Sequence, residues 1–485
     1  MTRDLTRHPN NANVTLIPMR IGGEWRIGET EFDDLDPYRR EVVARVPEST
    51  AQDLDDALNA ALTAKATIAA MPAYERAALL HRESDLLTDR IDTIAEIMSR
   101  ETGKAIKDAR AEVARSQDTL TLSAEEAIRI EGEHVPLDGT PTGIGKLAML
   151  LRFPVGVVAA ITPFNAPFNL ACHKVAPAIA AGNAVVLKPP SAAPYIVHKV
   201  VELFVEAGTP PGVLNAVYGR AAGPALVRDP RVDFITFTGS ERTGAEIKAA
   251  SGLRRVALEL GNNGPVIVHA DVSVDEAASL CARNAMRIAG QSCVSVQNIY
   301  THQSLYERFL ASLVREVRTL RVGDPLDPAT DVGTLIDKAA AERVEQWVEE
   351  AVTQGARVLT GGRRRRGAQY EPTVLIDTQP TMRVCRDEIF GPVVTVRAYA
   401  DLDPVFAEIS ESRYGLQCGV FTQSLEVALR AVRSLRTGGV IINGTSTWRV
   451  DQMAYGGIKD SGIGREGPHY AIEEMTDQRL VVFNM

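Results

Sequence analysis

The spacing of hydrophobic residues predicts long amphipathic helices in the first quarter of the chain. Between residues 50 and 128, apolar side chains recur every three to four positions, as Leu54, Leu58 and Ala61 do. Shorter segments flank this helical stretch, and residues 21–25 and 131–151 each predict a β-hairpin. We expect the hairpin at 131–151 to stand by itself.

From residue 155 onward, apolar strands and amphipathic helices alternate. Predicted strands cover residues 155–162, 184–188, 215–217, 234–237, 265–268, 297–301 and 356–359. Predicted helices cover residues 169–181, 195–207, 222–227, 274–289, 307–320 and 338–354. This alternation occurs in two series, so we predict an α/β fold of two doubly wound domains. A last apolar strand, 479–483, lies far in sequence from either series.

Composition and charge favour a soluble protein without a nucleic-acid partner. The length of 485 residues favours two or three domains. The net charge of −9 argues against nucleic acid, because phosphate binding needs a basic surface. No apolar run reaches about 18 residues, and the first ten residues hold no apolar core. We therefore expect no membrane span, no signal peptide and a cytoplasmic location.

The five cysteines do not form a pattern of disulfides or metal ligands. They are odd in number and scattered, with no C-x-x-C pair, which favours a reducing compartment and no zinc site. Cys293 alone lies among small residues, in the segment GQSC, where a thiolate could be reached by a substrate. A lone cysteine is more often a small buried hydrophobe, which is our prediction for Cys172, Cys281, Cys385 and Cys418.

Two polar residues stand where predicted strands end. Glu259 lies between apolar residues in LELG, where a carboxyl is either salt-bridged or has the raised pKa that suits a general base. Asn165 lies in TPFNAP, whose two prolines would fix the loop and let the amide donate to an oxyanion. An Asx-turn is the commoner role of an isolated asparagine.

Two more segments that follow strands could hold a phosphate or a ribose. Ser240 in FTGS precedes a helix, so it either caps that helix or binds a phosphate there. Lys188 in KPPS could bond ribose hydroxyls or a phosphate, although a solvent-facing lysine is the simpler explanation. The dinucleotide fingerprint G-x-G-x-x-G does not follow any predicted strand. The run Arg363 to Arg366 favours a solvated loop over an anion site.

Together and in this order, these segments resemble the aldehyde dehydrogenase family over essentially the whole chain. The matching segments are TPFNAP (162–167), KPPS (188–191), FTGS (237–240), LELG (258–261), GQSC (290–293), EIFGP (388–392) and YGGIKDSGIGREG (455–467). The resemblance implies an enzyme that oxidises an aldehyde to a carboxylic acid with NAD(P)+, through a thioester on cysteine and without a metal.

The resemblance also implies a role for each matching residue. Cys293 would be the nucleophile and Glu259 the general base, while Asn165 and the backbone N–H of Cys293 would form the oxyanion hole. The implied cofactor contacts are Thr162, Pro163, Lys188, Ser191, Gly219, Gly223, Gly239, Ser240, Leu260, Glu388 and Phe390. Lys188 would hold the adenosine ribose, Ser240 the pyrophosphate and Glu388 the nicotinamide ribose.

Domain boundaries follow from the same resemblance. A Rossmann-like cofactor domain would comprise 1–128 and 150–259, and a catalytic domain 260–449 with a loop to 465. A small β arm, 129–149 and 466–485, would mediate a homodimer or homotetramer by completing a neighbouring subunit's sheet. This arm would give the terminal strand a partner.

The sequence departs from the family at two places near the cofactor. Asn262 and Asn263 follow Gly261, where Gly-Lys is common, and could change the packing of the loop after Glu259. Ser191 stands where strictly NAD-dependent relatives often carry glutamate, which would repel a 2′-phosphate. We therefore expect NADP+ to be accepted, with preference over NAD+ left open.

The substrate funnel would be built from Arg110, Phe168, Ser292, Trp448 and Arg449. Phe168 and Trp448 could enclose an apolar or aromatic tail, whereas the arginines could pair with a carboxylate or phosphate. The segment from Trp448 resembles relatives that oxidise small polar aldehydes such as lactaldehyde, semialdehydes or phosphonoacetaldehyde, so we expect a small polar or anionic aldehyde. An ion pair between Arg449 and Asp451, or an interface contact, explains this arginine equally well.

Three alternatives remain at this stage. The substrate could be an aromatic or aliphatic aldehyde. The acyl group could pass to CoA, although such relatives often lack the carboxylate at the position of Glu259. A binding protein that kept only the fold is disfavoured because Cys293, Glu259 and Asn165 are all present.

Overall fold

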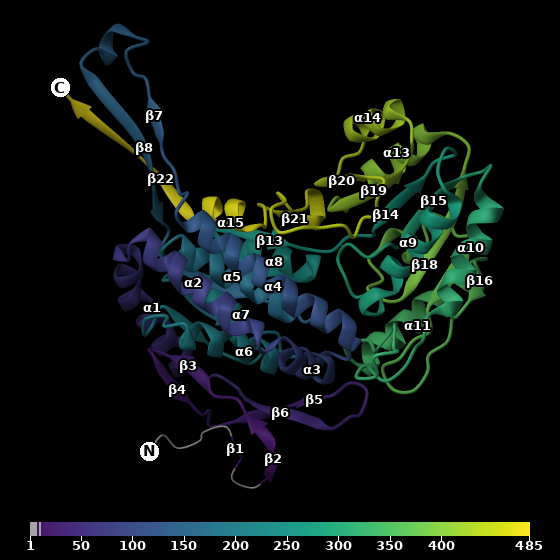
Figure 1. The fold of residues 1–485 in the computed structure, drawn as a ribbon, viewed down its shortest axis with the longest axis horizontal. Helices are drawn as coiled ribbons and strands as arrows, with labels where there is room; N and C mark the ends of the chain where they lie inside the picture. Colours follow the sequence, from purple (N-terminus) through teal and green to yellow (C-terminus); the bar gives the residue numbers. More distant parts are fainter. Residues whose placement is uncertain (1–6, 9–10) are drawn as a thin grey trace.

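The protein contains two large β-sheets, each covered by helices (Figure 1). Its computed structural model describes residues 7–8 and 11–485. The first sheet has the strand order β21-β13-β12-β9-β10-β11-β3-β4. Its strands are β3 (Met19–Ile21), β4 (Glu24–Arg26), β9 (Val157–Ile161), β10 (Ala184–Lys188), β11 (Leu214–Ala216), β12 (Phe234–Thr238), β13 (Arg255–Glu259) and β21 (Gly462–Ile463). The strands from β13 to β11 are parallel, and β21 and β3 pair antiparallel at either side.

Helices cover both faces of this sheet, because the chain changes direction across it at β9. They are α1 (Ala51–Ala70), α5 (Pro167–Ala180), α6 (Pro194–Glu206), α7 (Ala222–Arg228) and α8 (Glu241–Ser251). Right-handed crossovers in opposite directions place α5 and α6 on one face and α7 and α8 on the other. An outer layer of α2 (Ala73–Thr88), α3 (Ile91–Thr102) and α4 (Ile106–Ala127) packs on α5 and α6. Among the described residues, no helix is long and apolar enough to cross a membrane.

The second sheet has the order β16-β17-β18-β15-β14-β19-β20 and is parallel except at β16. Its strands are β14 (Pro265–Val268), β15 (Asn298–His302), β16 (Arg357–Thr360), β17 (Thr373–Ile376), β18 (Val393–Tyr399), β19 (Gln417–Phe421) and β20 (Gly439–Ile442). Its helices are α9 (Val274–Met286), α10 (Tyr306–Thr319), α11 (Lys338–Thr353), α12 (Arg383–Arg386), α13 (Leu402–Glu411) and α14 (Leu425–Ser434). Separate hydrophobic cores lie on its two faces.

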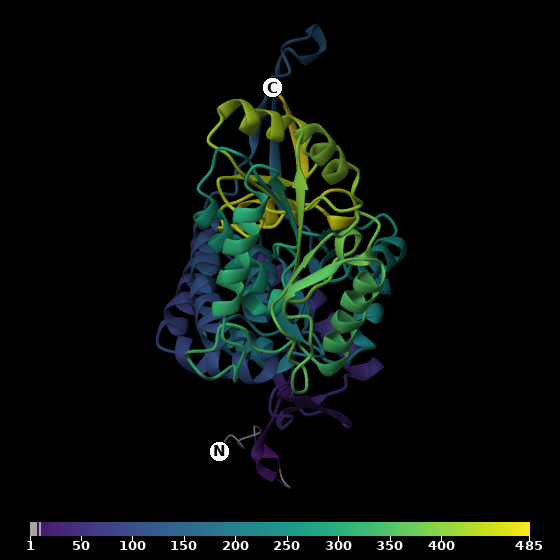
Figure 2. The same cartoon turned by 90° about the vertical axis from the view of Figure 1, so that its right-hand side faces the viewer.

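Two smaller sheets project from this body (Figures 1 and 2). Near the N-terminus, β1 (Arg7–His8), β2 (Asn11–Leu16), β6 (Val42–Pro47) and β5 (Glu31–Leu35) form one sheet. At the opposite end, β7 (Glu133–Val135), β8 (Lys146–Pro154) and β22 (Thr476–Asn484) form the arm, reached from the body through α15 (Pro468–Glu474). The terminal strand β22 pairs with β8 over its whole length, which gives the strand predicted at 479–483 its partner.

The doubly wound α/β class predicted from the sequence is confirmed, with one informative difference in its elements. The helix predicted at 274–289 ends at Met286. Ile288 and Ala289 adopt left-handed φ angles of 55° and 52°, which a helix cannot contain. The run of arginines lies in a loop as expected, with Arg364 paired to Glu345.

A buried carboxyl in the helical layer makes stability depend on pH. Glu83 on α2 is fully buried, and neither of its carboxylate oxygens has a hydrogen-bond partner among the described residues. Burial raises the pKa of Glu83 well above its usual 4.5. Because the unfolded chain loses this proton at lower pH, this group's contribution falls by about 1.4 kcal/mol per pH unit above 4.5, up to the folded-state pKa.

We expect Glu83→Met to remove this dependence. The gain in melting temperature over the wild type, measured by calorimetry, should be several degrees larger at pH 8 than at pH 5. An equal gain at both pH values would mean that packing alone changed.

Candidate active site

A cavity of about 1000 Å³ opens where the carboxyl ends of the first sheet's strands face the second α/β unit. Residues that follow β9, β10, β12 and β13 line one side, among them Thr162, Asn165, Lys188, Gly239, Ser240, Leu260 and Gly261. The other side is formed by Cys293, Arg343, Trp347, Glu388 and Phe390. This edge is where doubly wound sheets bind ligands, and the volume is at the upper end for small-molecule sites.

Cys293 reaches the cavity wall through a strained turn. The left-handed residues Ile288 and Ala289 are followed by Gly290, whose φ is 71°. Such conformations in non-glycine residues cost about 1–3 kcal/mol each and cluster at functional sites. The turn leaves Cys293 half-buried at the cavity, whereas the other four cysteines are buried, as predicted.

The surroundings of Cys293 disfavour its ionised form. The pKa of the thiol is raised to about 12, chiefly by burial and also by the carboxyls of Glu388 and Glu259. Two groups act in the opposite direction: the hydroxyl of Tyr455, 3.1 Å from the sulfur, and the charge of Arg449. A thiol in this setting reacts as a nucleophile only if a base removes its proton or a neighbour stabilises the anion.

Glu259 ends β13 and is buried beside a cluster of charges. Its Oε2 atom has no hydrogen-bond partner among the described residues. Burial raises its pKa well above 4.5, the like charge of Glu466 adds to this, and Arg449 and Lys174 oppose it. Glu466 pairs with Arg449 at 2.7 Å and with Lys174 at 3.6 Å. A carboxylate whose pKa is raised is, once ionised, a stronger base toward water than an ordinary glutamate.

Asn165 lies in the loop between β9 and α5 and faces the cavity with Cys293. The start of α5 is held by Glu112 on α4, whose Oε1 accepts the N–H groups of Phe168 at 3.1 Å and Asn169 at 3.2 Å. Lys104 donates to the other oxygen of Glu112. The two prolines in this loop are therefore helped by a carboxylate from a neighbouring helix, which fixes the backbone just beyond Asn165.

Comparisons with known proteins agree with this geometry. The model of the aldehyde dehydrogenase family matches residues 25–481. The chain belongs to the aldehyde dehydrogenase family. A 3-sulfolactaldehyde dehydrogenase of Priestia megaterium is 46% identical over 468 residues, covering 96% of this chain and 97% of the relative.

Solved structures of aldehyde dehydrogenases superpose closely on this enzyme. Aldehyde dehydrogenase 21 of Physcomitrella patens, in complex with the reaction product succinate, has a TM-score of 0.95 and 38% identity, covering 97% of this chain and 98% of that one. The NADP-dependent glyceraldehyde-3-phosphate dehydrogenase of Bacillus halodurans, complexed with NADP, has a TM-score of 0.94 and 33% identity, covering 96% and 99%. The protein is thus an NAD(P)+-dependent enzyme that oxidises an aldehyde to an acid.

The cavity of this aldehyde dehydrogenase fits a dinucleotide. The hydroxyls of Thr162 and Thr238 at its edge are buried and have no hydrogen-bond partners among the described residues, so they are open to a polar ligand. Ser240 caps α8 by accepting the N–H of Thr243, so the capping alternative is correct, and it also lines the cavity. A side chain at Gly239 would collide with the ring of Phe237, so only glycine leaves this wall intact.

Most of the predicted cofactor residues line the cavity, with the exception of Ser191 and Gly219. The unusual pair Asn262 and Asn263 strengthens the wall around Glu388. The N–H of Asn262 donates to Glu388 at 3.0 Å, and the amide of Asn263 donates to the carbonyl of Cys385 at 3.2 Å. The backbone at residue 262 therefore orients Glu388, and the side chain of Asn263 anchors the loop after Glu259.

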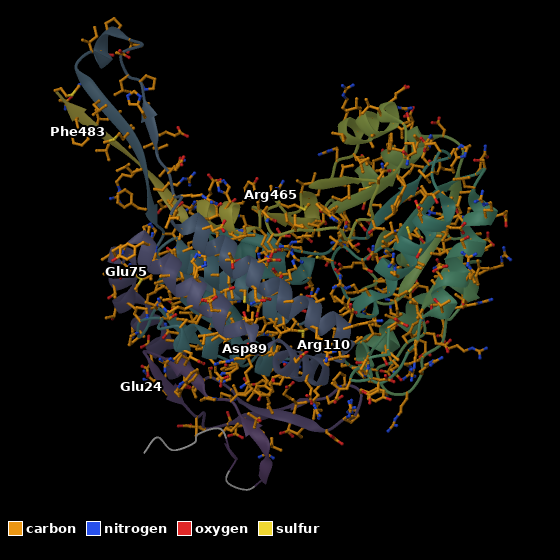
Figure 3. All side chains as sticks on the ribbon, in the orientation of Figure 1. Glu24, Glu75, Asp89, Arg110, Arg465 and Phe483 are labelled. Atoms are coloured by element: carbon orange, nitrogen blue, oxygen red, sulfur yellow. The ribbon has the colours of Figure 1, made fainter. Side chains whose placement is uncertain are left out.

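The five residues predicted to bind the substrate differ in burial and in their partners. Arg110, labelled in Figure 3, is 47% exposed on α4 and pairs with Asp92 instead of reaching Cys293. Phe168 is fully buried in the core of the first sheet, because α5 turns it inward. Trp448 is largely exposed, and Ser292 is half-buried beside Cys293. Arg449 forms an ion pair with Glu466, whereas the alternative to a substrate-binding role pairs it with Asp451.

The structure adds a charged network that the motifs did not reveal. Asp451 is buried and accepts from Arg115 at 2.9 Å and from Thr119 at 2.6 Å, both on α4. Its other neighbour is His173 on α5, at 3.3 Å, where burial lowers the pKa of the imidazole. Arg449 lies 3.4 Å from the same imidazole. Neither Arg115 nor His173 lies in a motif, and only the contact between α4 and α5 brings them together.

Proposed function

We propose that this enzyme oxidises a short hydroxyaldehyde with an anionic tail, of the 3-sulfolactaldehyde type, to its carboxylic acid. The observation that carries the proposal is the position of Arg449. Its guanidinium lies 3.8 Å from the ring of Tyr455, whose hydroxyl contacts Cys293, so one phenol separates a cation from the nucleophile. The Nε atom of Arg449 is buried and has no partner within the described chain, which leaves a donor for a substrate oxygen.

The local charges favour an anion. Arg115, Arg449 and Lys174 supply three cations beside the carboxylates of Asp451 and Glu466. The side chain of Arg115 is one-third exposed, so an incoming anion can reach it. The forked donors of a guanidinium match the oxygens of a sulfonate or carboxylate. Such a tail would therefore pair with Arg115 and Arg449. The similarity to a 3-sulfolactaldehyde dehydrogenase also supports a substrate with a sulfonate tail.

We infer that Cys293 acts as the nucleophile. The thiol first loses its proton to solvent. The sulfur of the thiolate then forms a bond to the aldehyde carbon, the carbon–oxygen double bond becomes a single bond, and the carbonyl oxygen becomes an alkoxide. The amide of Asn165 and the N–H of Cys293, which has no protein acceptor among the described residues, donate to that oxygen. When bound, NAD(P)+ supplies the hydride acceptor. Loss of hydride from the carbon leaves a thioester on Cys293.

Glu259 then takes a proton from water, and the water oxygen attacks the thioester carbon. The carbon–sulfur bond breaks, the sulfur leaves as the thiolate, and the carboxylic acid departs. Transfer of the acyl group to CoA is disfavoured because the buried Glu259 with its open oxygen would have no role in it.

The substrate proposal is tested with a matched pair of aldehydes. Lactaldehyde and 3-sulfolactaldehyde share a carbon chain and differ in the sulfonate. We expect Arg115→Gln to lower kcat/KM for 3-sulfolactaldehyde at least tenfold and for lactaldehyde less than threefold, measured as NAD(P)H formation. Arg110→Gln, on the same helix but paired with Asp92, is the control and should change neither value.

Cys293→Ala provides the blank, and acid release is measured with and without CoA. Equal kcat/KM values of the wild type for the two aldehydes would contradict the proposal that the enzyme recognises an anionic tail. Turnover that requires CoA and releases acyl-CoA in place of free acid would show an acylating enzyme.

We propose further that NADP+ is accepted through two cations at the rim of the cavity. Lys188, at the end of β10, has a pKa lowered to about 8 by burial; the charge of Glu48 opposes this change and the charge of Arg220 adds to it. Arg220 lines the cavity, is exposed and has no bonded partner within the described chain. The negative charge of a 2′-phosphate would be attracted to Lys188 and Arg220.

We expect Arg220→Ala to weaken NADP+ binding at least tenfold and NAD+ binding less than threefold, in fluorescence titrations. Arg228→Ala is the matched control, because Arg228 lines the same cavity but donates to the carbonyl of Pro224. An equal loss in both variants would assign the effect to the general charge of the rim.

We propose that the arm joins copies of this chain into a homodimer or homotetramer. Leu480, Val482 and Phe483 on β22 are 41–55% exposed on a strand that projects from the body, and Figure 3 labels Phe483 near its end. A strand with apolar side chains and an open edge favours pairing with another chain.

Replacing Leu480 and Phe483 together by glutamate should reduce the molar mass measured by light scattering to that of a smaller assembly. Leu253→Glu, at a fully exposed position on the body, should leave the mass unchanged. A wild-type monomer, or an unchanged mass in the arm variant, would contradict the assignment.

A further inference from the structure

Tyr455 places a phenol hydroxyl against the nucleophile. Its oxygen lies 3.1 Å from the sulfur of Cys293, and no other side chain of the described residues has a hydrogen bond to that sulfur. The ring is buried in a small apolar cluster with Val294, Leu416 and Met453, which also contacts Cys293. The phenol is therefore held in place by packing, so the contact does not depend on a flexible side chain.

The direction of this hydrogen bond is decided by chemistry once the thiol ionises. A thiolate carries no proton and can only accept, so the hydroxyl of Tyr455 must be the donor. Burial raises the pKa of Tyr455 well above 10, which keeps the proton on the phenol. Hydrogen bonds to an ionised acceptor are roughly twice as strong as those between neutral groups.

Arg449 makes the hydroxyl of Tyr455 a stronger hydrogen-bond donor. Its guanidinium lies 3.8 Å from the centre of the Tyr455 ring, and Glu466 holds it there at 2.7 Å. A cation over the face of the ring attracts its π electrons, and this polarises the O–H bond toward the sulfur. The backbone groups of Tyr455 and Glu466 also exchange two hydrogen bonds, of 3.2 Å and 2.6 Å, so phenol, guanidinium and carboxylate are fixed as one unit.

A donor at this point offsets the unfavourable surroundings of the sulfur. The charges of Glu259 and Glu388 both disfavour a negative sulfur and raise the pKa of Cys293. Tyr455 is the neutral group in contact with the sulfur that favours the anion.

We propose that Tyr455 is a catalytic residue that stabilises the thiolate of Cys293, both before attack on the aldehyde and when the thiolate leaves the thioester. The inference rests on the proposed role of Cys293. In the thiohemiacetal and the thioester the sulfur is neutral and a poor acceptor, so the hydrogen bond is strong only when the sulfur is an anion. Tyr455 thus favours the start and the end of the cycle and leaves the intermediates nearly unaffected.

The test measures the thiol without any aldehyde. In alkylation by iodoacetamide, the thiolate forms a sulfur–carbon bond and iodide leaves. The rate at Cys293 is followed between pH 6 and 11 by mass spectrometry of its peptide, in the purified full-length enzyme. We expect Tyr455→Phe to move the pH profile upward by about one unit, which is a tenfold lower rate at pH 7.5. The kcat for an oxidised aldehyde should fall more than KM changes.

Tyr399→Phe is the matched control, because it removes a buried hydroxyl that contacts His269 and not Cys293. Its alkylation profile should match that of the wild type. An unchanged profile in Tyr455→Phe would overturn the inference and would leave the proposed function intact, as long as Cys293→Ala abolishes NAD(P)H formation. A wild type that still oxidises aldehydes after Cys293 is fully alkylated would overturn the proposed function itself.

Discussion

The catalytic centre depends on the ion pairs that the buried carboxylate of Glu466 forms. Glu466 pairs with Lys174 from the first α/β unit and with Arg449 from the loop that follows the second sheet. Its backbone is bonded to Tyr455, and its charge raises the pKa of Glu259. Removing one partner of such a buried group leaves uncompensated charge, which costs several kcal/mol. Lys174 and Arg449 are therefore both needed while Glu466 is buried and charged.

The second requirement is the strained turn between α9 and Cys293. Ile288 and Ala289 adopt left-handed conformations, and Ala289 is buried in the core of the second α/β unit. A helix continued through these residues, as their apolar pattern suggests, would direct Cys293 elsewhere. The strain is local, while its compensation is spread over a core of many residues, as is typical of functional sites.

Helix α4 connects recognition to chemistry. Its Glu112 fixes the start of α5, and therefore the loop that carries Asn165. One and two turns further along, respectively, Arg115 and Thr119 bind Asp451, which lies two residues from Arg449. A single helix thus supports the donor for the oxyanion and the cation proposed to bind the substrate's tail. An anionic tail and the reacting carbonyl would consequently be positioned by one rigid element.

The sequence by itself determined the layout of strands and helices, the family, and the positions of Cys293, Glu259 and Asn165. These features are encoded in local periodicity and in short motifs, because a buried strand or a loop at a strand's end has a recognisable composition. Only the tertiary structure decided which arginines lie near the sulfur. Arg110 and Arg115 occupy the same helix, and the sequence gives no reason to choose between them. The packing of α4 on α5 turns Arg115 toward Asp451 and leaves Arg110 in solvent.

Tyr455 and Glu466 illustrate the same division. Both belong to a motif that identified the family, yet nothing in the motif indicates that the phenol contacts the sulfur or that the carboxylate joins Lys174 to Arg449. These contacts link residues more than 160 positions apart in two cases, Cys293 with Tyr455 and Lys174 with Glu466. Pairing at such distances depends on how two separately folded sheets meet, and no local pattern of side chains records that geometry.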